Sequence, residues 1–454
     1  MSDGSMDGIT RAIAARARGI TFDALPGDVV VLARQCLLDW MGVTLAGADE
    51  PLARMLREEA LEAGGNPQAT VIGSAVKSSV GQAALINGAA SHALDFDDVQ
   101  MMMSGHPSVP VIPALLALAE HRGASGREFI AAFVAGVELE CRVGALVMPG
   151  HYSTGFHATG TLGTFGAAAA CAHLLGLDEG QWLHAMGIAG AQAAGLKSMF
   201  GTMCKPLHAG KASANGLLAA TLAARGFTSN QAVLEVAQGF AATQTATPNP
   251  ERALSGLGED WALRGVLFKY HAACYGTHET IEGVLRLKNE HGLRAEDVQR
   301  ISLTVPRGNL AMCNIEEPST ALEGKFSLRF TAALALAGED TSEQAFTDGA
   351  VRRPELVALR NRVQVAGREK GAGTDVVIST TSGAELRTSV NLETPAEDLN
   401  LQLVRLEAKF SSLARPAIGD SVADALRTRI GRLEDEDSLA NLVSLAAARE
   451  VARV

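Results

Sequence analysis

Aromatic side chains, paired cysteines and surplus positive charge are all scarce in this sequence of 454 residues. Aromatic residues make up 4% of the chain while glycine alone contributes 47 residues, a composition that favours closely packed helices over a β-sandwich. The six cysteines form no CxxC pair, which argues against a zinc or disulfide framework and indicates reduced thiols in the cytoplasm. A net charge of -11 argues against nucleic acid as a partner, because contacts to phosphates need a basic surface.

The sequence also lacks the short motifs of several common enzyme classes. It contains no GxSxG nucleophile elbow, no P-loop and no Rossmann GxGxxG fingerprint, so we expect acid–base chemistry without an organic cofactor. The first residues, MSDGSMDGIT, are acidic and polar, unlike a signal peptide. Residues 155–177 lack Asp, Glu, Lys and Arg, but their histidines, glycines and threonines favour a loop and a buried helix over a membrane span.

The length of the chain predicts two domains, since one compact core rarely reaches this size. A change from helical to mixed helical and alternating hydrophobic patterns along the chain predicts the same. Residues 1–267, completed by 401–454, read as a large all-helical domain, and residues 268–400 read as a smaller α+β domain. The expected helices of the first part cover residues 29–46, 80–94, 110–121, 163–176, 179–195 and 211–225. We therefore predict a mainly α protein.

Local patterns support both predicted domains. The sequence SGRE at residues 125–128 predicts a capping box before an apolar helix. RISLTVP alternates Ile301, Leu303 and Val305, the pattern of a half-buried strand. The remaining predictions for the smaller domain are strands at 362–367, 375–381 and 385–392 and helices at 277–288, 326–337 and 354–361.

One segment, HALDFDDVQMMMSGHP, gathers acid and imidazole groups in an apolar setting. It contains His92, Asp95, Asp97, Asp98 and His106. Buried charges are costly unless they are paired or used, and these groups are the usual ones of proton transfer. The ordinary alternatives are a helix cap or solvated loop for an aspartate, and a bond to nearby backbone for His106 in its Gly-His-Pro turn.

Two further polar clusters lie among small and apolar residues. GFHATGT places His157 and Thr159 before an alanine-rich helix, whose N-terminus would favour an anion. MCKPLHAGK places Lys205 and His208 just before another helix, where a fixed cation would bind a carboxylate or an enolate-like charge. The alternatives are a core histidine and a lysine whose stem covers apolar surface. Lys269 is a second cation, at the predicted domain junction.

The aspartates also admit a magnesium-dependent alternative. A helical prenyl-transferring enzyme would hold magnesium and diphosphate with an Asp-rich cluster, and HxxDxDD offers nitrogen and oxygen ligands. Such enzymes need a second Asp-rich cluster, and this sequence has no convincing one. We therefore predict no metal, and sensitivity to EDTA would support the alternative.

At these residues the chain resembles the MmgE/PrpD family, which includes 2-methylcitrate dehydratase, cis-aconitate decarboxylase and iminodisuccinate epimerase. The matching segments are HALDFDD with GHPSVPVIPALLALAE, GFHATGTLGTFGAAAA, MCKPLHAGKASANG, KYHAACYGTHETIE and LEGKFSLRF, in the family's order over roughly residues 20–400. The resemblance implies a helical domain closed by an α+β lid, a homodimer, and an active site in the cleft between. It also implies small di- or tricarboxylate substrates and no metal or organic cofactor.

Carried over residue by residue, the resemblance assigns to the active site Asp95, His106, His157, Lys205 and Lys269. The two histidines would be acid and base, the two lysines would hold carboxylates, and Asp95 would orient a neighbour or contact the substrate. We also expect His208 and Thr159 to contact the substrate. The shared chemical step would be removal of a proton next to a carboxylate-bearing carbon.

Three reactions share that step: a dehydratase expels hydroxide, an epimerase returns the proton on the other face, and a decarboxylase loses carbon dioxide. The decarboxylase branch has a threonine where this chain has Val99 and a lid tyrosine where Met312 or Cys313 stands. Its KPYP-like motif keeps the lysine here but continues with Tyr270 and His271. We therefore expect a 2-methylcitrate dehydratase-like hydro-lyase, with an epimerase-like isomerase or a cis-aconitate decarboxylase-like enzyme as alternatives.

A different class of protein also fits the sequence, a non-catalytic carboxylate-binding or dimeric scaffold protein. A thermal shift with carboxylates but no turnover would favour it, while the acid and base residues argue against it. Our prediction is a cytoplasmic, homodimeric, cofactor-free lyase or isomerase, with a small carboxylate as its partner and neither nucleic acid nor membrane.

Overall fold

The computed structural model describes residues 6–369 and 371–447, and the chain folds as two compact units. The helical unit comprises the described residues of Met1–Phe268 and Ala396–Val454, and the α+β unit comprises those of Lys269–Pro395. The predicted fold class, mainly α with a smaller α+β part, is confirmed.

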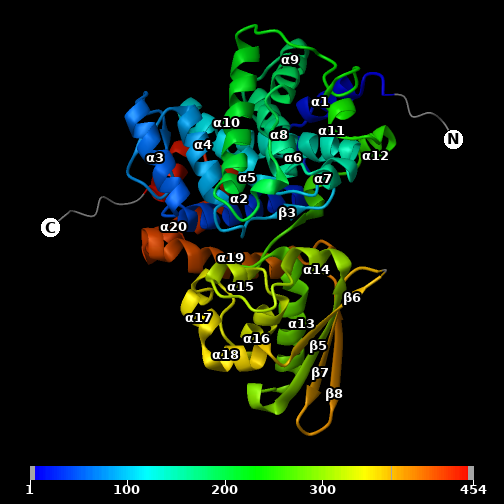
Figure 1. The fold of residues 1–454 in the computed structure, drawn as a ribbon. Helices are drawn as coiled ribbons and strands as arrows, with labels where there is room; N and C mark the ends of the chain where they lie inside the picture. Colours follow the sequence, from blue (N-terminus) through cyan, green and yellow to red (C-terminus); the bar gives the residue numbers. More distant parts are fainter. Residues whose placement is uncertain (1–5, 370, 448–454) are drawn as a thin grey trace. The chain divides into compact units, whose positions relative to one another are not determined.

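The helical unit is built from helices joined by short loops (Figure 1). From the first part of the chain come α1 (Ile9–Arg18), α2 (Gly27–Gly47), α3 (Pro51–Ala63), α4 (Val80–Ser91), α5 (Ser108–Arg122), α6 (Gly126–Val147), α7 (Gly150–Thr154), α8 (Ala158–Leu174), α9 (Glu179–Gly190), α10 (Cys204–Ala224), α11 (Phe240–Gln244) and α12 (Pro250–Leu254). From the end of the chain come α19 (Leu399–Ile418), α20 (Asp420–Ile430) and α21 (Leu439–Val443). Two pairs of two-residue strands accompany them, β1 (Ala69–Thr70) with β2 (Lys77–Ser78) and β3 (Val99–Gln100) with β4 (Val266–Leu267).

Helix α8 lies in the core of this unit, packed against α5, α6, α9 and α10 (Figure 1). All of its residues from Ala158 to Ala172 are buried, as its uniformly small and apolar sequence predicts. Small residues also let α4 and α10 approach closely: a Cβ at Gly88 would lie 2.8 Å from the Cα atom of Gly210. The two helices that flank the polar clusters are therefore held at near backbone contact.

Helix starts follow the local sequence. The predicted capping box of α6 is confirmed, because the Ser125 side chain accepts from the Glu128 backbone N–H and the Glu128 carboxylate accepts from the Ser125 N–H. The start predicted for α10 is wrong, since the helix begins at Cys204 and not at residue 211. Pro206 is tolerated in the first turn of a helix, where its missing N–H costs no hydrogen bond. Lys205 and His208 therefore lie on the helix itself.

Helix α2 is long and apolar enough to cross a membrane by length and composition, but 78% of its apolar window is buried inside the unit. The core helices of soluble proteins pass the same test, so this is weak evidence for a span. Residues 155–177, which lack Asp, Glu, Lys and Arg, form the predicted loop and buried helix, α8.

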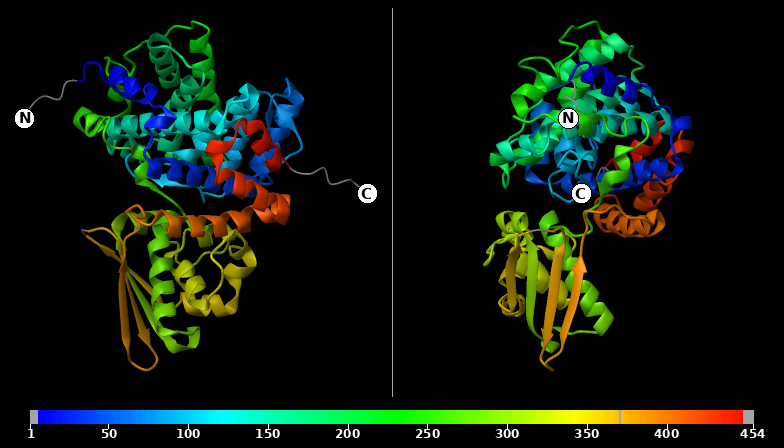
Figure 2. Two further views of the ribbon diagram at one scale, coloured as in Figure 1. Left: turned by 180° about the vertical axis from the view of Figure 1, so that it is seen from behind. Right: turned by 90° about the vertical axis from the view of Figure 1, so that its right-hand side faces the viewer.

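The α+β unit has one four-stranded sheet with the order β6-β5-β7-β8. Its strands are β5 (Val298–Pro306), β6 (Val363–Arg368), β7 (Thr374–Thr380) and β8 (Glu385–Val390), and its helices are α13 (Tyr275–His291), α14 (Arg307–Cys313), α15 (Ala321–Lys325), α16 (Leu328–Ala337), α17 (Asp348–Arg352) and α18 (Pro354–Arg360). β5 pairs in parallel with β6 and antiparallel with β7, and β7 and β8 form a hairpin, drawn in orange in Figure 2. The predicted alternation of β5 is confirmed, because Ile301, Leu303 and Val305 are buried. Helices α13 and α16 pack against each other, with α13 against β7 and β8.

Candidate active site

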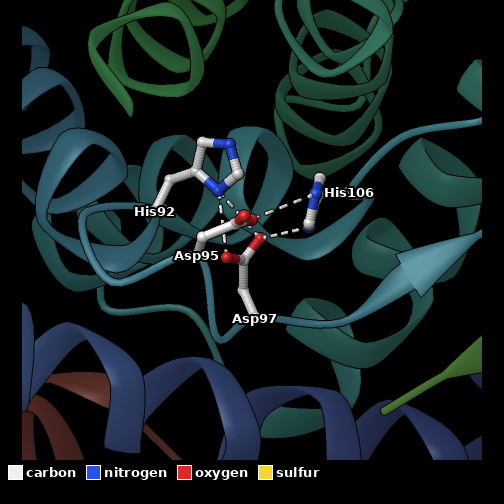
Figure 3. A group of neighbouring side chains, drawn as sticks. All are labelled: His92, Asp95, Asp97 and His106. Carbon is white, nitrogen blue, oxygen red and sulfur yellow. Dashed lines mark hydrogen bonds and ion pairs between the residues drawn. The ribbon is translucent and has the colours of Figure 1, made fainter. Parts of the chain in front are cut away.

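The loop between α4 and α5 folds back on itself and brings its acid and imidazole groups together (Figure 3). His92 follows the last residue of α4, and His106 lies just before α5. A bridge between Gln100 and Gly105 closes the end of the loop. Asp95 has a φ of 52°, a left-handed conformation that aspartate tolerates better than most residues. The close spacing of these side chains therefore depends on the turns of the loop.

Asp97 lies at the centre of the group and faces two imidazoles. Its two carboxylate oxygens lie 2.9 and 3.1 Å from His92 Nδ1. His106 Nδ1 lies 2.8 Å from Asp97 Oδ2, at ion-pair distance but without the alignment of a hydrogen bond. Burial raises the pKa of Asp97, but the neighbouring His106 and His92 outweigh burial and hold it well below its usual range. Burial lowers the pKa of His92 to about 4, against the opposing effect of Asp97.

Lys205 and Asp95 form the more open side of the site. Lys205 Nζ lies 2.7 Å from Asp95 Oδ1, and His106 Nε2 lies 3.6 Å from the same oxygen. The side chains of Lys205 and Asp95 are 14% and 28% exposed, whereas those of His92 and Asp97 are at most 1% exposed. His92 and Asp97 thus form the buried part of the site, and Lys205 and Asp95 form the part that is open to solvent.

His157 and His208 form a second imidazole pair next to this group. Their Nδ1 atoms are 2.9 Å apart, so one ring donates and the other accepts. The ring of His157 stacks on that of His92 with centroids 5.8 Å apart, and Phe200 meets it edge-on at 5.0 Å. Burial, and then the neighbouring His92 and Lys205, hold the pKa of His157 well below its usual value. Burial and Lys205 also lower the pKa of His208.

The structure therefore brings together most of the residues predicted from the sequence: Asp95, His106, His157, Lys205 and His208. Thr159 is fully buried, and its hydroxyl accepts from the His106 N–H at 3.1 Å, so in this structure it fixes the backbone of His106. Lys269 is the first residue of the α+β unit, where it is buried. Burial, and then His271 and Lys269, hold the pKa of His278 well below its usual value.

Two members of the group did not figure among the predicted site residues, His92 and Asp97. The sequence signal for them was the density of acid and imidazole groups in one loop, but it does not distinguish Asp97 from Asp98. The structure distinguishes them: Asp98 is buried against Ser108 and accepts hydrogen bonds from its backbone N–H and its hydroxyl. Burial, and then Asp39, raise the pKa of Asp98 to about 8. Asp98 is therefore a structural carboxylic acid and Asp97 a charged one.

The group, which we call the proton-transfer cluster, comprises His92, Asp95, Asp97, His106, His157, Lys205 and His208. It offers imidazoles to take or return a proton, the buried carboxylate of Asp97 to orient two of them, and an ammonium group to hold an anion. A separate cavity of about 460 Å³, lined in part by Leu118, Arg122 and Leu217, shares no residue with it. The chemistry of the side chains, more than cavity size, marks the cluster as the candidate site.

Comparison with known proteins covers both units. Residues 11–253 match the MmgE/PrpD N-terminal domain, and residues 271–435 match the MmgE/PrpD C-terminal domain. The chain is similar to human cis-aconitate decarboxylase, with 29% identity over 374 residues, 79% of this chain and 76% of that protein. It is also similar to cis-aconitate decarboxylase of Aspergillus terreus, with 26% identity over 387 residues, 80% of this chain and 79% of the other. A cis-aconitate decarboxylase-like protein of Aspergillus oryzae is 29% identical over 336 residues, 69% of this chain and 70% of that protein.

Proposed function

Because the chain belongs to the MmgE/PrpD family, we propose that it is a lyase that acts on a small di- or tricarboxylate by proton transfer at the carbon next to a carboxylate. The observation that carries this proposal is the meeting of His106, Asp97 and Lys205 in one cluster. The names of the relatives, which are decarboxylases, support the lyase class.

Lys205 is the proposed anchor for a substrate carboxylate. Its ammonium group is bound to Asp95, and the lysine side chain as a whole is 14% exposed, so a carboxylate of the substrate can approach from the open side. Lysine is a compact cation with three donors, which suits a carboxylate that must bind and then leave as product. The substrate would share or replace the contact with Asp95.

His106 is the proposed base. Asp97 lies beside its Nδ1 atom, which favours the hydrogen on that nitrogen and leaves Nε2 as the acceptor on the open side, toward Asp95. The proton taken from carbon would pass to Nε2, and the resulting imidazolium would be stabilised by the buried carboxylate.

The second imidazole pair favours dehydration over decarboxylation. Elimination of water needs a base at one carbon and an acid at the leaving hydroxyl, and the cluster offers both in the His106–Asp97 and His157–His208 pairs. The C–H proton would pass to His106 and its electron pair would form the double bond. The hydroxide would leave with a proton relayed from solvent through the His157–His208 pair, so that both of these imidazoles end the step neutral. Decarboxylation has no leaving hydroxyl to protonate, so it gives the His157–His208 pair no such role. We therefore place a hydro-lyase first.

Decarboxylation is the second candidate function, because each of the relatives named above bears that activity in its name. Against it stands Val99, whose buried side chain carries no hydroxyl and whose backbone pairs with Leu267. At 26–29% identity the reaction branch of a relative does not transfer by itself.

Proton NMR in deuterium oxide with a panel of di- and tricarboxylates tests the reaction directly. An alkene signal with no loss of a carboxyl group is the expected result. Loss of carbon dioxide would make decarboxylation the function. Deuterium incorporation without net change would indicate an epimerase, and a thermal shift without turnover would indicate a carboxylate-binding protein.

Two substitutions connect the reaction to the cluster. His106→Gln and Lys205→Met are expected to lower kcat/KM by about a hundredfold or more, because they remove the base and the anion anchor. Matched controls are His121→Gln and Lys211→Met, since both residues are exposed and Lys211 lies on the same helix as Lys205. Equal activity in the cluster variants and the controls would contradict the proposed site.

We further propose that the enzyme acts in the cytoplasm as a homodimer, without a metal or organic cofactor and without nucleic acid or a membrane as partner. Six free thiols support a reducing compartment, and the net charge of -11 supports the absence of nucleic acid. Lys269 remains a proposed second carboxylate ligand. Light scattering of the purified protein tests the dimer.

A further inference from the structure

Four side chains of the proton-transfer cluster are arranged like the ligands of a transition metal. Each of His92, Asp95, Asp97 and His106 offers one nitrogen or oxygen, and these atoms all lie within 4.8 Å of one another. Figure 3 shows their imidazole and carboxylate groups pointing toward one another. Imidazole nitrogen and carboxylate oxygen are ordinary ligands of Zn²⁺.

The separations between these atoms are close to those of a tetrahedral zinc site. With bonds of about 2.1 Å, neighbouring ligand atoms lie about 3.4 Å apart. In the cluster, His92 Nδ1 is 2.9 Å from Asp97 Oδ1, and His106 Nε2 is 3.6 Å from Asp95 Oδ1. These two pairs already lie near the tetrahedral spacing, and the widest separation in the group, up to 4.8 Å, has to close by about 1.4 Å for all four atoms to enclose an ion.

A second observation concerns the hydrogen-bond partners of these groups in the described structure. His106 Nδ1 is buried and 2.8 Å from Asp97 Oδ2, yet it makes no aligned hydrogen bond there. One ion takes a single nitrogen of His106, either Nε2 beside Asp95 or Nδ1 beside Asp97, and the unaligned contact at Nδ1 leaves that nitrogen available as well. Asp95, 28% exposed, gives such an ion a path from solvent.

We infer that the His92, Asp95, Asp97 and His106 group is also an inhibitory binding site for Zn²⁺. An ion held there occupies the imidazole and the carboxylate that hold and orient the transferred proton, so turnover stops while it is bound. The ion is not a cofactor, and the inhibition, unlike the binding, rests on the proposed function.

Lys205 sets the affinity of this site. Its ammonium group and the ion compete for Asp95, with Lys205 Nζ only 2.7 Å from Asp95 Oδ1. Two carboxylates and one ammonium leave the group with a formal charge that a divalent ion over-compensates, so binding is reversible and weaker than in a structural zinc site. Removing the lysine charge must therefore tighten zinc binding, although it abolishes anchoring of the substrate.

The test is a pair of variants whose zinc affinities move in opposite directions. Isothermal titration with Zn²⁺, and the visible absorption of bound Co²⁺, measure binding without any substrate. Compared with the natural protein, Lys205→Met is expected to bind Zn²⁺ about tenfold more tightly. Asp97→Asn and His106→Gln are expected to bind it at least about tenfold more weakly, because each loses a ligand. Lys211→Met, on the same helix but exposed, is the control expected to match the natural protein.

Equal zinc affinity in the natural protein and in both ligand variants would overturn the inference, as would weaker binding to Lys205→Met. His106 is partly exposed, so His106→Gln keeps the test valid if Asp97→Asn does not fold. Turnover is then measured with and without Zn²⁺: inhibition that EDTA reverses is expected, and full activity with the site occupied would overturn the inhibitory role. If no carboxylate is turned over by metal-free enzyme, the proposed function fails while the binding result stands.

Discussion

Asp97 contacts the Nδ1 atoms of two imidazoles, so its charge decides which nitrogen of each ring carries the hydrogen. In Asp97→Asn the volume is kept but the charge is lost, and the new amide can donate to the rings. We expect kcat to fall by about a hundredfold to ten-thousandfold, because His106 is no longer held as a base with a free Nε2. Steady-state kinetics with the substrate identified by NMR measure this.

Asp98→Asn is the matched control for that substitution. Burial, and then Asp39, raise the pKa of Asp98 to about 8, so at pH 7 it is already a neutral acid bound to Ser108. An asparagine there exchanges one neutral group for another, and we expect kcat to stay within about threefold of the natural value. Equal losses in the two variants would mean that the loop, and not the charge of Asp97, limits the reaction.

The residue types of the site could be predicted from the sequence, but the separate role of each residue could not. His106, His157 and Lys205 stand out in the sequence because polar groups in apolar settings need a partner or a use. The separate roles of Asp97 and Asp98 depend on the turn at Asp95, whose φ of 52° no pattern predicts. The hydrogen bond from the His106 N–H to the Thr159 hydroxyl was likewise not predicted, and the substrate contact of Thr159 stays a prediction.

At the scale of elements, α19 contacts and positions the loop of the cluster through Lys409. Lys409 Nζ lies 2.6 Å from Asp39 Oδ1 on α2 and donates to the Phe96 carbonyl at 2.6 Å. Phe96 lies between Asp95 and Asp97, and both side chains of the ion pair are at most 4% exposed. A helix from the end of the chain therefore positions the carboxylates of a loop near its start.

We expect the double variant Asp39→Asn/Lys409→Met to lose about tenfold or more in kcat, because the Phe96 carbonyl loses its donor and the loop shifts. Removing both charges avoids the cost of about 3–5 kcal/mol that one unpaired buried charge would add. KM should change less than kcat, since Lys205 is untouched. Kinetics are measured below the melting temperature of the variant.

The control for this pair is Glu138→Gln/Arg142→Met, which removes another buried ion pair, 2.8 Å long, within α6. We expect a lower melting temperature but an unchanged kcat. If the control loses as much kcat as the α19 variant, general loosening of the helical unit explains both, and Lys409 has no special role in positioning.

Elements with strong local signals were predicted well. The capping box before α6 and the alternating burial of β5 each depend on a few adjacent residues, so a local pattern is enough to predict them. The pairing of β3 with β4 was not predicted, because it joins two residues near position 99 to two near 266. The start of α10 was placed too late: the helix begins at Cys204, before Pro206, and a proline in the first turn costs a helix little.

At the scale of the whole molecule, the change from helical to alternating patterns predicted a boundary between residues 267 and 268, and in the structure the helical unit ends at Phe268. The return to the helical unit was predicted at residue 401, and in the structure it occurs at Ala396. A boundary shows in a sequence as a change of pattern, but its last residues are fixed by packing against distant segments, which a local pattern does not contain.

Buried histidines outside the cluster predict how the stability of the molecule depends on pH. His151 is fully buried with Nε2 2.7 Å from Thr161 Oγ1, and burial lowers its pKa to about 4. Burial also lowers the pKa of His173 and of His278. Each has a lower pKa in the folded chain than in the unfolded chain, so the unfolded chain takes up protons first. The stability these groups support is complete above about pH 6.5 and is lost as the pH falls toward 4.

We therefore expect the melting temperature to fall steadily between pH 7 and pH 4.5, and the fall to be smaller in His151→Gln. Glutamine keeps a polar partner for Thr161 but takes up no proton, so it removes one contribution of up to about 1.4 kcal/mol per pH unit. Calorimetric scans of the two proteins across this range make the measurement, with the exposed His121→Gln as control. An identical pH slope in His151→Gln and the natural protein would mean that His151 becomes protonated without global unfolding, through a local opening of the α7 region.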